Sequence, residues 1–170
     1  MSHRLAPYVQ LFAMNDFLFQ RALGLVGEDQ AGKRLDPSTN SFEGLAAHLL
    51  ISRQSLAEAL GLHPTPLPFE GLGEGTEAGF GGSESFPSLD TLRGAWSQLG
   101  TTLLTGLTDV DDATLAQQSP MDIPGIENAD LADFSALNVV HESYHIGQLG
   151  LIAKAVSGSG VMSPDASAPV

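Results

Sequence analysis

The stretch ADLADFSALNVVHESYHIGQLGLIAKAV, residues 129–156, carries the clearest structural signal in this chain. Its apolar residues recur every three to four positions along almost its whole length, which predicts one long helix. Asp130 and Asp133 open the stretch, where a helix dipole favours anionic side chains. Gly158 and Gly160 follow it, and glycine commonly ends helices. The sequence therefore predicts a helix over about residues 129–156.

Two histidines stand on this helix with a spacing that places them together. His141 and His145 are four residues apart, so their side chains lie on one face, one above the other. The residues that share this face at about 100° per residue are mostly apolar: Phe134, Leu137, Asn138, Gln148 and Ile152. We therefore expect both imidazoles to point toward the interior of the protein, where each needs a polar partner.

Three further stretches show helical periodicity, at about residues 7–25, 41–60 and 88–106. The first carries Val9, Phe12, Ala13, Phe17 and Leu23 on roughly one side. Asn40 with Glu43 resembles a capping box at the start of the second, and Gly61 marks its end.

The third helix has Ser88 as its expected cap. Four long helices with apolar stripes predict an all-α four-helix bundle. The prediction is one domain over residues 1–157 and a flexible tail over 158–170. The proline- and glycine-rich connection 61–87 is either a lid or a simple linkage.

Charge and composition exclude several classes of function. The chain has 7 Lys and Arg against 20 Asp and Glu, a formal net charge of −13. Nucleic acids and anionic membrane surfaces both require clustered basic residues, so neither is an expected partner. There is no cysteine, so any transition-metal site must use imidazole and carboxylate ligands. No signal-peptide pattern follows the N-terminus, and we expect a cytoplasmic protein.

His48 is the candidate third member of a histidine site. It lies in the middle of the second predicted helix, and small residues share its side: Ser41, Gly44, Ser52, Ser55 and Ala59. Opposite an inward His141–His145 pair, it becomes a plausible third metal ligand. Three imidazoles leave coordination positions open, as in catalytic rather than structural sites. The alternative is three core histidines that form hydrogen bonds to their neighbours.

The segment His141-Glu142-Ser143-Tyr144-His145 matches the H-E-x-x-H pattern of zinc proteases, in which the glutamate acts as general base. That class takes a third ligand downstream, and neither His nor Glu follows His145. Helical phase also places Glu142 about 100° from His141, on an interfacial or exposed flank. The sequence therefore favours a three-histidine site over a peptidase site.

Two segments resemble signatures of the DinB-like proteins. Residues 138–152, NVVHESYHIGQLGLI, are similar to the last helix of that family, and residues 42–53, FEGLAAHLLISR, to its second helix. Asn15 also matches a position where the first helix of the family often carries asparagine. The resemblance covers nearly the whole chain, and its specific part lies in these two histidine-bearing segments.

The resemblance implies an up-and-down-type bundle, often homodimeric, in which His48, His141 and His145 hold one divalent ion, most commonly zinc or nickel. Some members are thiol-dependent, namely maleylpyruvate isomerases that use mycothiol and S-transferases that use bacillithiol, while others are described as metal-dependent hydrolases. This chain lacks the basic patch expected for an anionic thiol cofactor.

The expected function is a metal-dependent enzyme of S-transferase or hydrolase type acting on a small molecule. Candidates to orient a metal-binding imidazole or a metal-bound water are Gln148, Tyr144 and Glu142. The alternatives are a non-catalytic metal- or ligand-binding stress protein and a dimerisation module in which the histidines have no role.

Overall fold

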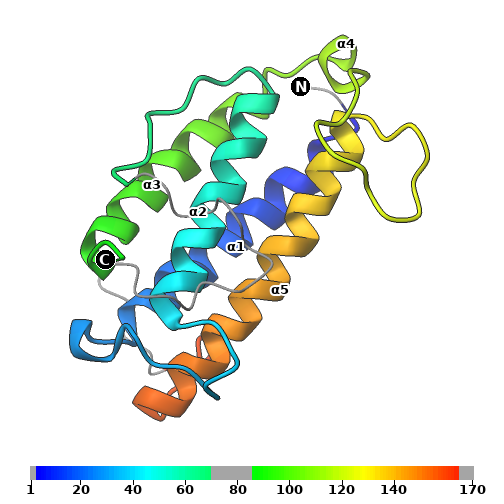
Figure 1. Ribbon diagram of the computed structural model, residues 1–170. Coiled ribbons are helices and arrows are strands. Elements are labelled where there is room, and N and C mark those ends of the chain that lie inside the picture. The colour runs from blue at the N-terminus through cyan, green and yellow to red at the C-terminus, as the bar shows by residue number, and fades with distance from the viewer. Residues whose placement is uncertain (1–2, 70–85, 165–170) are drawn as a thin grey trace.

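The computed structural model describes residues 3–69 and 86–164, and within them the chain forms helices without a strand (Figure 1). A 3-10 turn, η1 (Glu28–Gln30), and a short helix, α4 (Asp112–Leu115), accompany the long helices. The four long helices are α1 (Ala6–Gly24), α2 (Phe42–Ala59), α3 (Leu89–Gly106) and α5 (Leu131–Ser157). The predicted all-α four-helix class is therefore confirmed.

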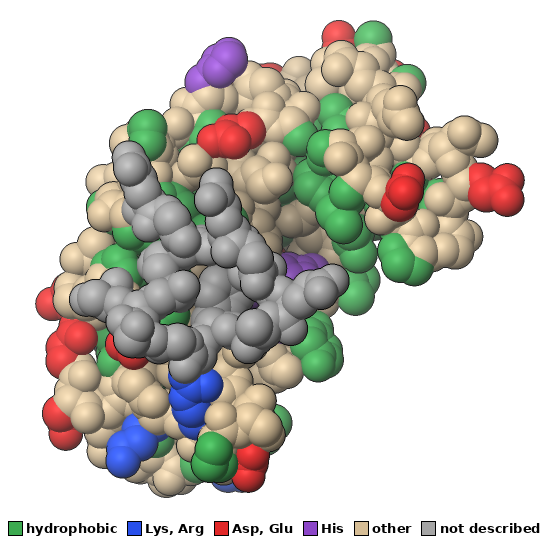
Figure 2. All heavy atoms as spheres, viewed as in Figure 1, with side chains coloured by type: hydrophobic (Ala, Val, Ile, Leu, Met, Phe, Trp, Pro, Cys, Tyr) green, Lys and Arg blue, Asp and Glu red, His purple; other side chains and the backbone are tan. Residues whose placement is uncertain are grey.

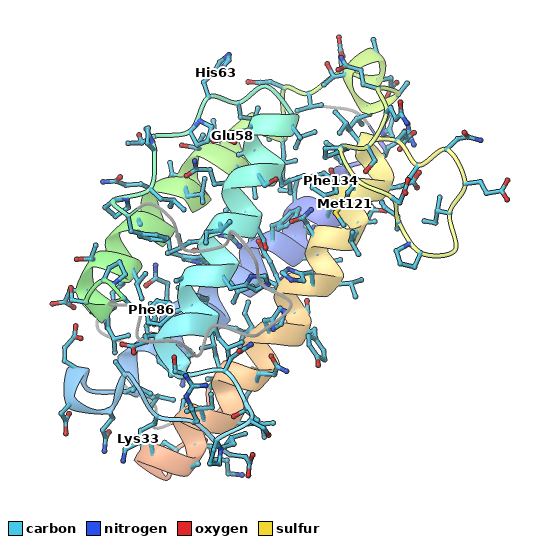
Figure 3. The ribbon with its side chains drawn as sticks, viewed as in Figure 1. Lys33, Glu58, His63, Phe86, Met121 and Phe134 are labelled. Atoms are coloured by element: carbon cyan, nitrogen blue, oxygen red, sulfur yellow. The ribbon has the colours of Figure 1, made fainter. Side chains whose placement is uncertain are left out.

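Each long helix packs against two others, in the order α1, α5, α2, α3 around the bundle. Helices α1 and α5 run in the same direction, as the pairings of Arg4 with Asp130 and of Asn15 with Glu142 show. Helices α2 and α3 run the opposite way, parallel to each other (Figure 1). The side chains of Glu58 on α2 and Phe134 on α5 accordingly lie toward the same end of the bundle, and Lys33 lies at the other (Figure 3).

This topology differs from a simple up-and-down bundle and explains the long connection before α3. Helix α2 has 18 residues and is therefore ~27 Å long. A parallel successor requires the chain to return over that whole length, whereas antiparallel neighbours are joined by short loops. Residues 70–85 of this connection, on which the lid hypothesis depends, lie outside the described residues.

Side-chain caps define where α2, α3 and α5 begin. Ser41, and not the expected Asn40, caps α2, because its side chain accepts a hydrogen bond from the Gly44 N–H. Ser88 caps α3 as predicted and accepts from Thr91. Asp130 forms a full capping box with Asp133 at the start of α5. Gly158, in the left-handed conformation with φ of 78°, ends α5.

The buried face of α1 differs from the predicted one. Phe12 and Phe19 are fully buried, and Phe19 stacks on Trp96 of α3 with 3.8 Å between ring centroids. Phe17, expected on the same face, is 54 % exposed, and Ala13 is exposed as well. Apolar side chains occupy most of the circumference of α1, so their periodicity does not single out the buried face.

The segments at both ends of α5 pack against the bundle. Leu115 and Ile123, from the segment before α5, are buried in the core. Beyond α5, Val161 packs against the core, and Arg21 of α1 donates a hydrogen bond to the Ser163 carbonyl. Residues 165–170 of the expected tail lie outside the described residues. None of the described helices has the length and hydropathy of a membrane span.

Two glycines on α3 provide a matched pair for testing the packing. A Cβ on Gly94 would meet nothing within 4 Å, whereas one on Gly100 would lie 2.5 Å from Asp16 Oδ1 and 3.3 Å from Arg53 Nη1. We expect Gly94→Ala to stabilise the protein by ~0.5–1 kcal/mol through helix propensity. Gly100→Ala should destabilise it by ~1–3 kcal/mol through overpacking. Urea denaturation of both variants checks this, and equal stabilisation would contradict the close packing around Gly100.

Candidate metal centre

The three histidines predicted from the sequence meet between α2 and α5. The Nε2 atoms of His48 and His141 lie 2.9 Å apart, at hydrogen-bonding distance. Their ring centroids lie 4.9 and 4.5 Å, respectively, from that of His145. One potential ligand atom from each of the three rings lies within 4.8 Å of those from the other two. Residues distant in the sequence thus form one cluster of imidazoles.

The histidine cluster lies at the boundary of the core and not in its centre. All three side chains are half-buried, and histidine atoms are visible on one face of the molecule beside hydrophobic side chains (Figure 2). The expectation of fully inward histidines is therefore only partly met, because the centre of the buried face of α5 lies at Glu142, Ile146 and Leu149. This position leaves the cluster accessible from solvent.

The nitrogen geometry fits a divalent metal ion. Zinc binds imidazole nitrogen at ~2.0–2.1 Å, which places tetrahedral ligand nitrogens ~3.4 Å apart. The observed separations, 2.9 Å for His48–His141 and up to 4.8 Å in the group, bracket that value. Small side-chain movements therefore suffice for the three-histidine group to hold a metal ion.

A family model described as the DinB superfamily matches residues 17–149. The chain belongs to the DinB superfamily. The match includes all three histidines, α2, α3 and most of α5. No curated protein and no solved structure matches the chain.

Gln148 orients one of the histidines of this DinB protein. Its Oε1 atom lies 2.7 Å from His145 Nδ1. An amide oxygen only accepts, so His145 Nδ1 donates the hydrogen and its Nε2 lone pair is available to a metal. This arrangement is typical of metal-binding histidines, whose second nitrogen donates to a nearby acceptor. Of the candidates predicted to support the site, Gln148 has the contact expected for that role.

Tyr144 and Glu142 are placed differently from Gln148. The Tyr144 ring packs edge-on against His145 at 4.9 Å between centroids, and the residue is 63 % exposed. Glu142 was expected on an interfacial or exposed flank, and this expectation is wrong, because the residue is fully buried. Its carboxylate is paired with Arg53 on the core side of α5. The glutamate of the H-E-x-x-H match is thus directed away from the general-base position of a zinc protease.

The partner of Glu142 is a residue to which the sequence analysis gave no role. Arg53 Nε and Nη2 donate to Glu142 Oε1 and Oε2 at 2.7 and 2.8 Å, and both side chains are fully buried. Arg53 Nη1 also donates to Asp16 at 2.9 Å. Asn15 donates to Glu142 at 3.3 Å, and the Arg53 guanidinium lies 3.5 Å from the centroid of the Trp96 ring. We call Arg53, Glu142, Asp16 and Asn15 the Arg53 cluster.

A sequence signal for the Arg53 cluster does exist. Arg53 falls at helical spacing within the apolar series Leu45, Leu49, Leu56 and Leu60, so it lies on the core stripe of α2. An arginine on such a stripe needs a buried acidic partner. Periodicity alone does not identify that partner, because it lies on another helix.

The electrostatic environment keeps the histidines neutral near pH 7. Burial, together with the neighbouring imidazoles, lowers the pKa of His48 to about 4 and that of His141 to about 4. Burial also lowers the pKa of His145, and the hydrogen bond to Gln148 opposes that shift. Neutral imidazole is the form that binds metal, so these lowered pKa values favour metal binding at neutral pH.

The lowered pKa values predict how acid affects the metal-free protein. The unfolded chain protonates His48 and His141 near pH 6.5, whereas the folded protein resists protonation of these two residues until about pH 4. The unfolded state therefore binds more protons in this window, and the free energy of unfolding should fall as the pH decreases from 6.5 toward 4. Chemical denaturation between pH 7 and 5 measures the slope. The variant His48→Gln/His141→Gln should flatten this slope. An unchanged slope in the variant would contradict the lowered pKa values of His48 and His141 as its cause.

Proposed function

We propose that this DinB-superfamily protein binds one divalent metal ion, zinc or nickel, through His48, His141 and His145 and acts as a metal-dependent enzyme of thiol-dependent S-transferase or hydrolase type on a small molecule. The observation that carries the proposal is the convergence of three neutral, half-buried imidazoles at the boundary of the core. A structural zinc site commonly has four protein ligands, whereas three protein ligands leave a position open for water or substrate.

The chemistry available at such a site follows from its ligands. A bound divalent ion supplies Lewis acidity, lowering the pKa of a coordinated water toward ~7 or binding a thiolate. The protein contributes the arrangement of the nitrogens. The hydrogen bond from His145 to Gln148 supports a role for Gln148 in orienting that imidazole. The exposed Tyr144 ring beside His145 supports a contact between Tyr144 and a bound small molecule. Glu142 takes no part in this proposal, because Arg53 engages its carboxylate.

Activity measurements on metal-loaded protein test the proposal. The parent, loaded with zinc or nickel, is compared with metal-free parent and with His145→Ala in two assays. One follows substitution of the halide of an activated aromatic halide by a thiol, with release of halide ion, and the other follows hydrolysis of a nitrophenyl ester. Metal-dependent turnover that His145→Ala loses supports the enzyme. Metal binding that raises the melting temperature without turnover in either assay would instead support the non-catalytic binding protein.

The role of Gln148 gives a quantitative prediction. Gln148→Leu removes the acceptor for the His145 N–H at similar size, and we expect the affinity for zinc to fall ~10–100-fold. Gln148→Glu retains an acceptor and should remain close to the parent. Competition titration with a chromophoric chelator measures both variants. A Gln148→Leu variant with parental affinity would show that the 2.7 Å contact does not support the site.

The proposal also covers the location of the protein, its oligomeric state and its partners. We propose a cytoplasmic location and a homodimer. We also propose that the protein has no nucleic-acid or membrane partner, consistent with the net charge of −13. Sedimentation of the purified protein tests the homodimer, and a monomer at all concentrations would contradict it.

A further inference from the structure

The Arg53 cluster and the histidine cluster share the same two helices. On α5, Glu142 directly follows His141, and on α2, Arg53 is five residues beyond His48. At about 100° per residue, neighbouring side chains on one helix point in different directions. Glu142 is therefore buried in the core, while His141 stays at its boundary. A shift of α2 along α5 that separates Arg53 from Glu142 also separates His48 from His141.

Apolar packing is less directional than a two-point ion pair and selects this register less sharply. The first half of α2 buries several small residues, among them Gly44, Ala46 and Ala47. Hydrophobic contact is non-directional, and these small side chains form lower ridges than the buried leucines of the same helix. The two hydrogen bonds from Arg53 to Glu142, 2.7 and 2.8 Å long, select the register of α2 against α5 far more sharply. A shift by one helical turn, about 5.4 Å, breaks both.

The remaining members of the Arg53 cluster hold its position against the other helices. On α1, Asp16 accepts a hydrogen bond from Arg53 and Asn15 donates one to Glu142. Trp96 of α3 packs against the guanidinium, and Gly100 leaves no room there for a larger side chain. Stability does not account for a fully buried ion pair, because apolar residues of similar size are commonly as stabilising. A role in specifying geometry does account for it.

We propose that Arg53 and Glu142 are positioning residues for the histidine site: their buried two-point ion pair sets the register of α2 against α5 and so brings His48 opposite His141. The importance of this register for metal binding rests on the function proposed above. The His48–His141 contact, 2.9 Å between the two Nε2 atoms, provides a second measure of the register that does not depend on metal affinity.

The experiment uses three variants of the full chain and one control. Glu142→Asp keeps the charge and shortens the side chain by one bond, and Arg53→Lys keeps the charge and removes the planar fork. Arg53→Met/Glu142→Leu replaces the pair with apolar side chains and so retains a folded variant if the single variants unfold. Leu103→Ala removes a fully buried apolar side chain of α3 and so destabilises the protein without changing any histidine or any member of the Arg53 cluster.

Two quantities are measured for each variant. Zinc affinity, from chelator competition, should fall at least ~10-fold in all three pair variants and stay within about twofold of the parent in Leu103→Ala, by analogy with other outer residues of metal sites. The ¹⁵N spectra of the imidazoles in metal-free protein at pH 8 report the His48–His141 hydrogen bond. We expect its signature in the parent and in Leu103→Ala and its loss in the pair variants.

The outcomes separate this inference from the proposed function. Parental affinity and spectra in the folded pair variants would overturn the inference, as would an equal loss of affinity in Leu103→Ala at matched melting temperature. If the parent binds no zinc but the imidazole spectra change in the pair variants alone, the metal-binding function fails and the positioning role stands.

Discussion

Replacement of His141 or His48 by alanine is expected to reduce bound metal from about one divalent ion per chain to none, because two imidazoles alone bind such ions weakly. The three potential ligand atoms lie within 4.8 Å of one another, so the loss of either residue opens the site on one side. Elemental analysis of untagged protein, purified with zinc or nickel present, measures the stoichiometry.

The same replacement removes the stabilisation that metal provides. An ion at 1,000 times its dissociation constant adds ~4 kcal/mol to the free energy of unfolding, or roughly 10 °C in melting temperature for a chain of this size. The shift should be present in the parent and absent in His141→Ala. His63, in the connection after α2 with φ of 48°, supplies the control His63→Ala, which should retain metal and shift. Full occupancy in His141→Ala would refute the three-histidine site.

Removal of one partner of the Arg53–Glu142 pair should have the largest effect on the metal-free protein. Arg53→Met leaves the Glu142 carboxyl group fully buried without its guanidinium partner, and we expect a loss of ~3–5 kcal/mol. Glu142→Leu likewise leaves the buried Arg53 guanidinium without its carboxylate partner. The double variant removes both buried charges, while Asp16, with 28 % of its side chain exposed, can be hydrated. Its stability should therefore return close to that of the parent.

A double-mutant cycle, measured by urea denaturation of metal-free protein, quantifies this coupling. The matched control is Asp90→Asn, which breaks the exposed Arg93–Asp90 pair on α3, where Asp90 has 84 % side-chain exposure. That change should cost less than ~1 kcal/mol. Additive losses in the cycle would show that Arg53 and Glu142 are not energetically coupled, contrary to their geometry.

The sequence predicted the histidine site more accurately than the faces of the helices. The four-residue spacing of His141 and His145 fixes their common direction on any helix. The buried face of α5 was nevertheless placed at these histidines, whereas its centre lies near Glu142. Exposed Val140 and Leu151 are apolar as well, so α5 has hydrophobic side chains on most of its circumference. Periodicity then does not single out one buried face, and the same reason explains the exposure of Phe17.

The sequence by itself determined the helical class, the helix positions and the identity of the three histidines. These depend on local properties, namely helical periodicity, caps such as Ser88 and Asp130, and the spacing of residues on one helix. The tertiary structure alone decided that α2 and α3 are parallel and that Arg53 is paired with Glu142. Contacts between helices depend on relative direction, rotation and register, and short-range periodicity specifies none of these three quantities.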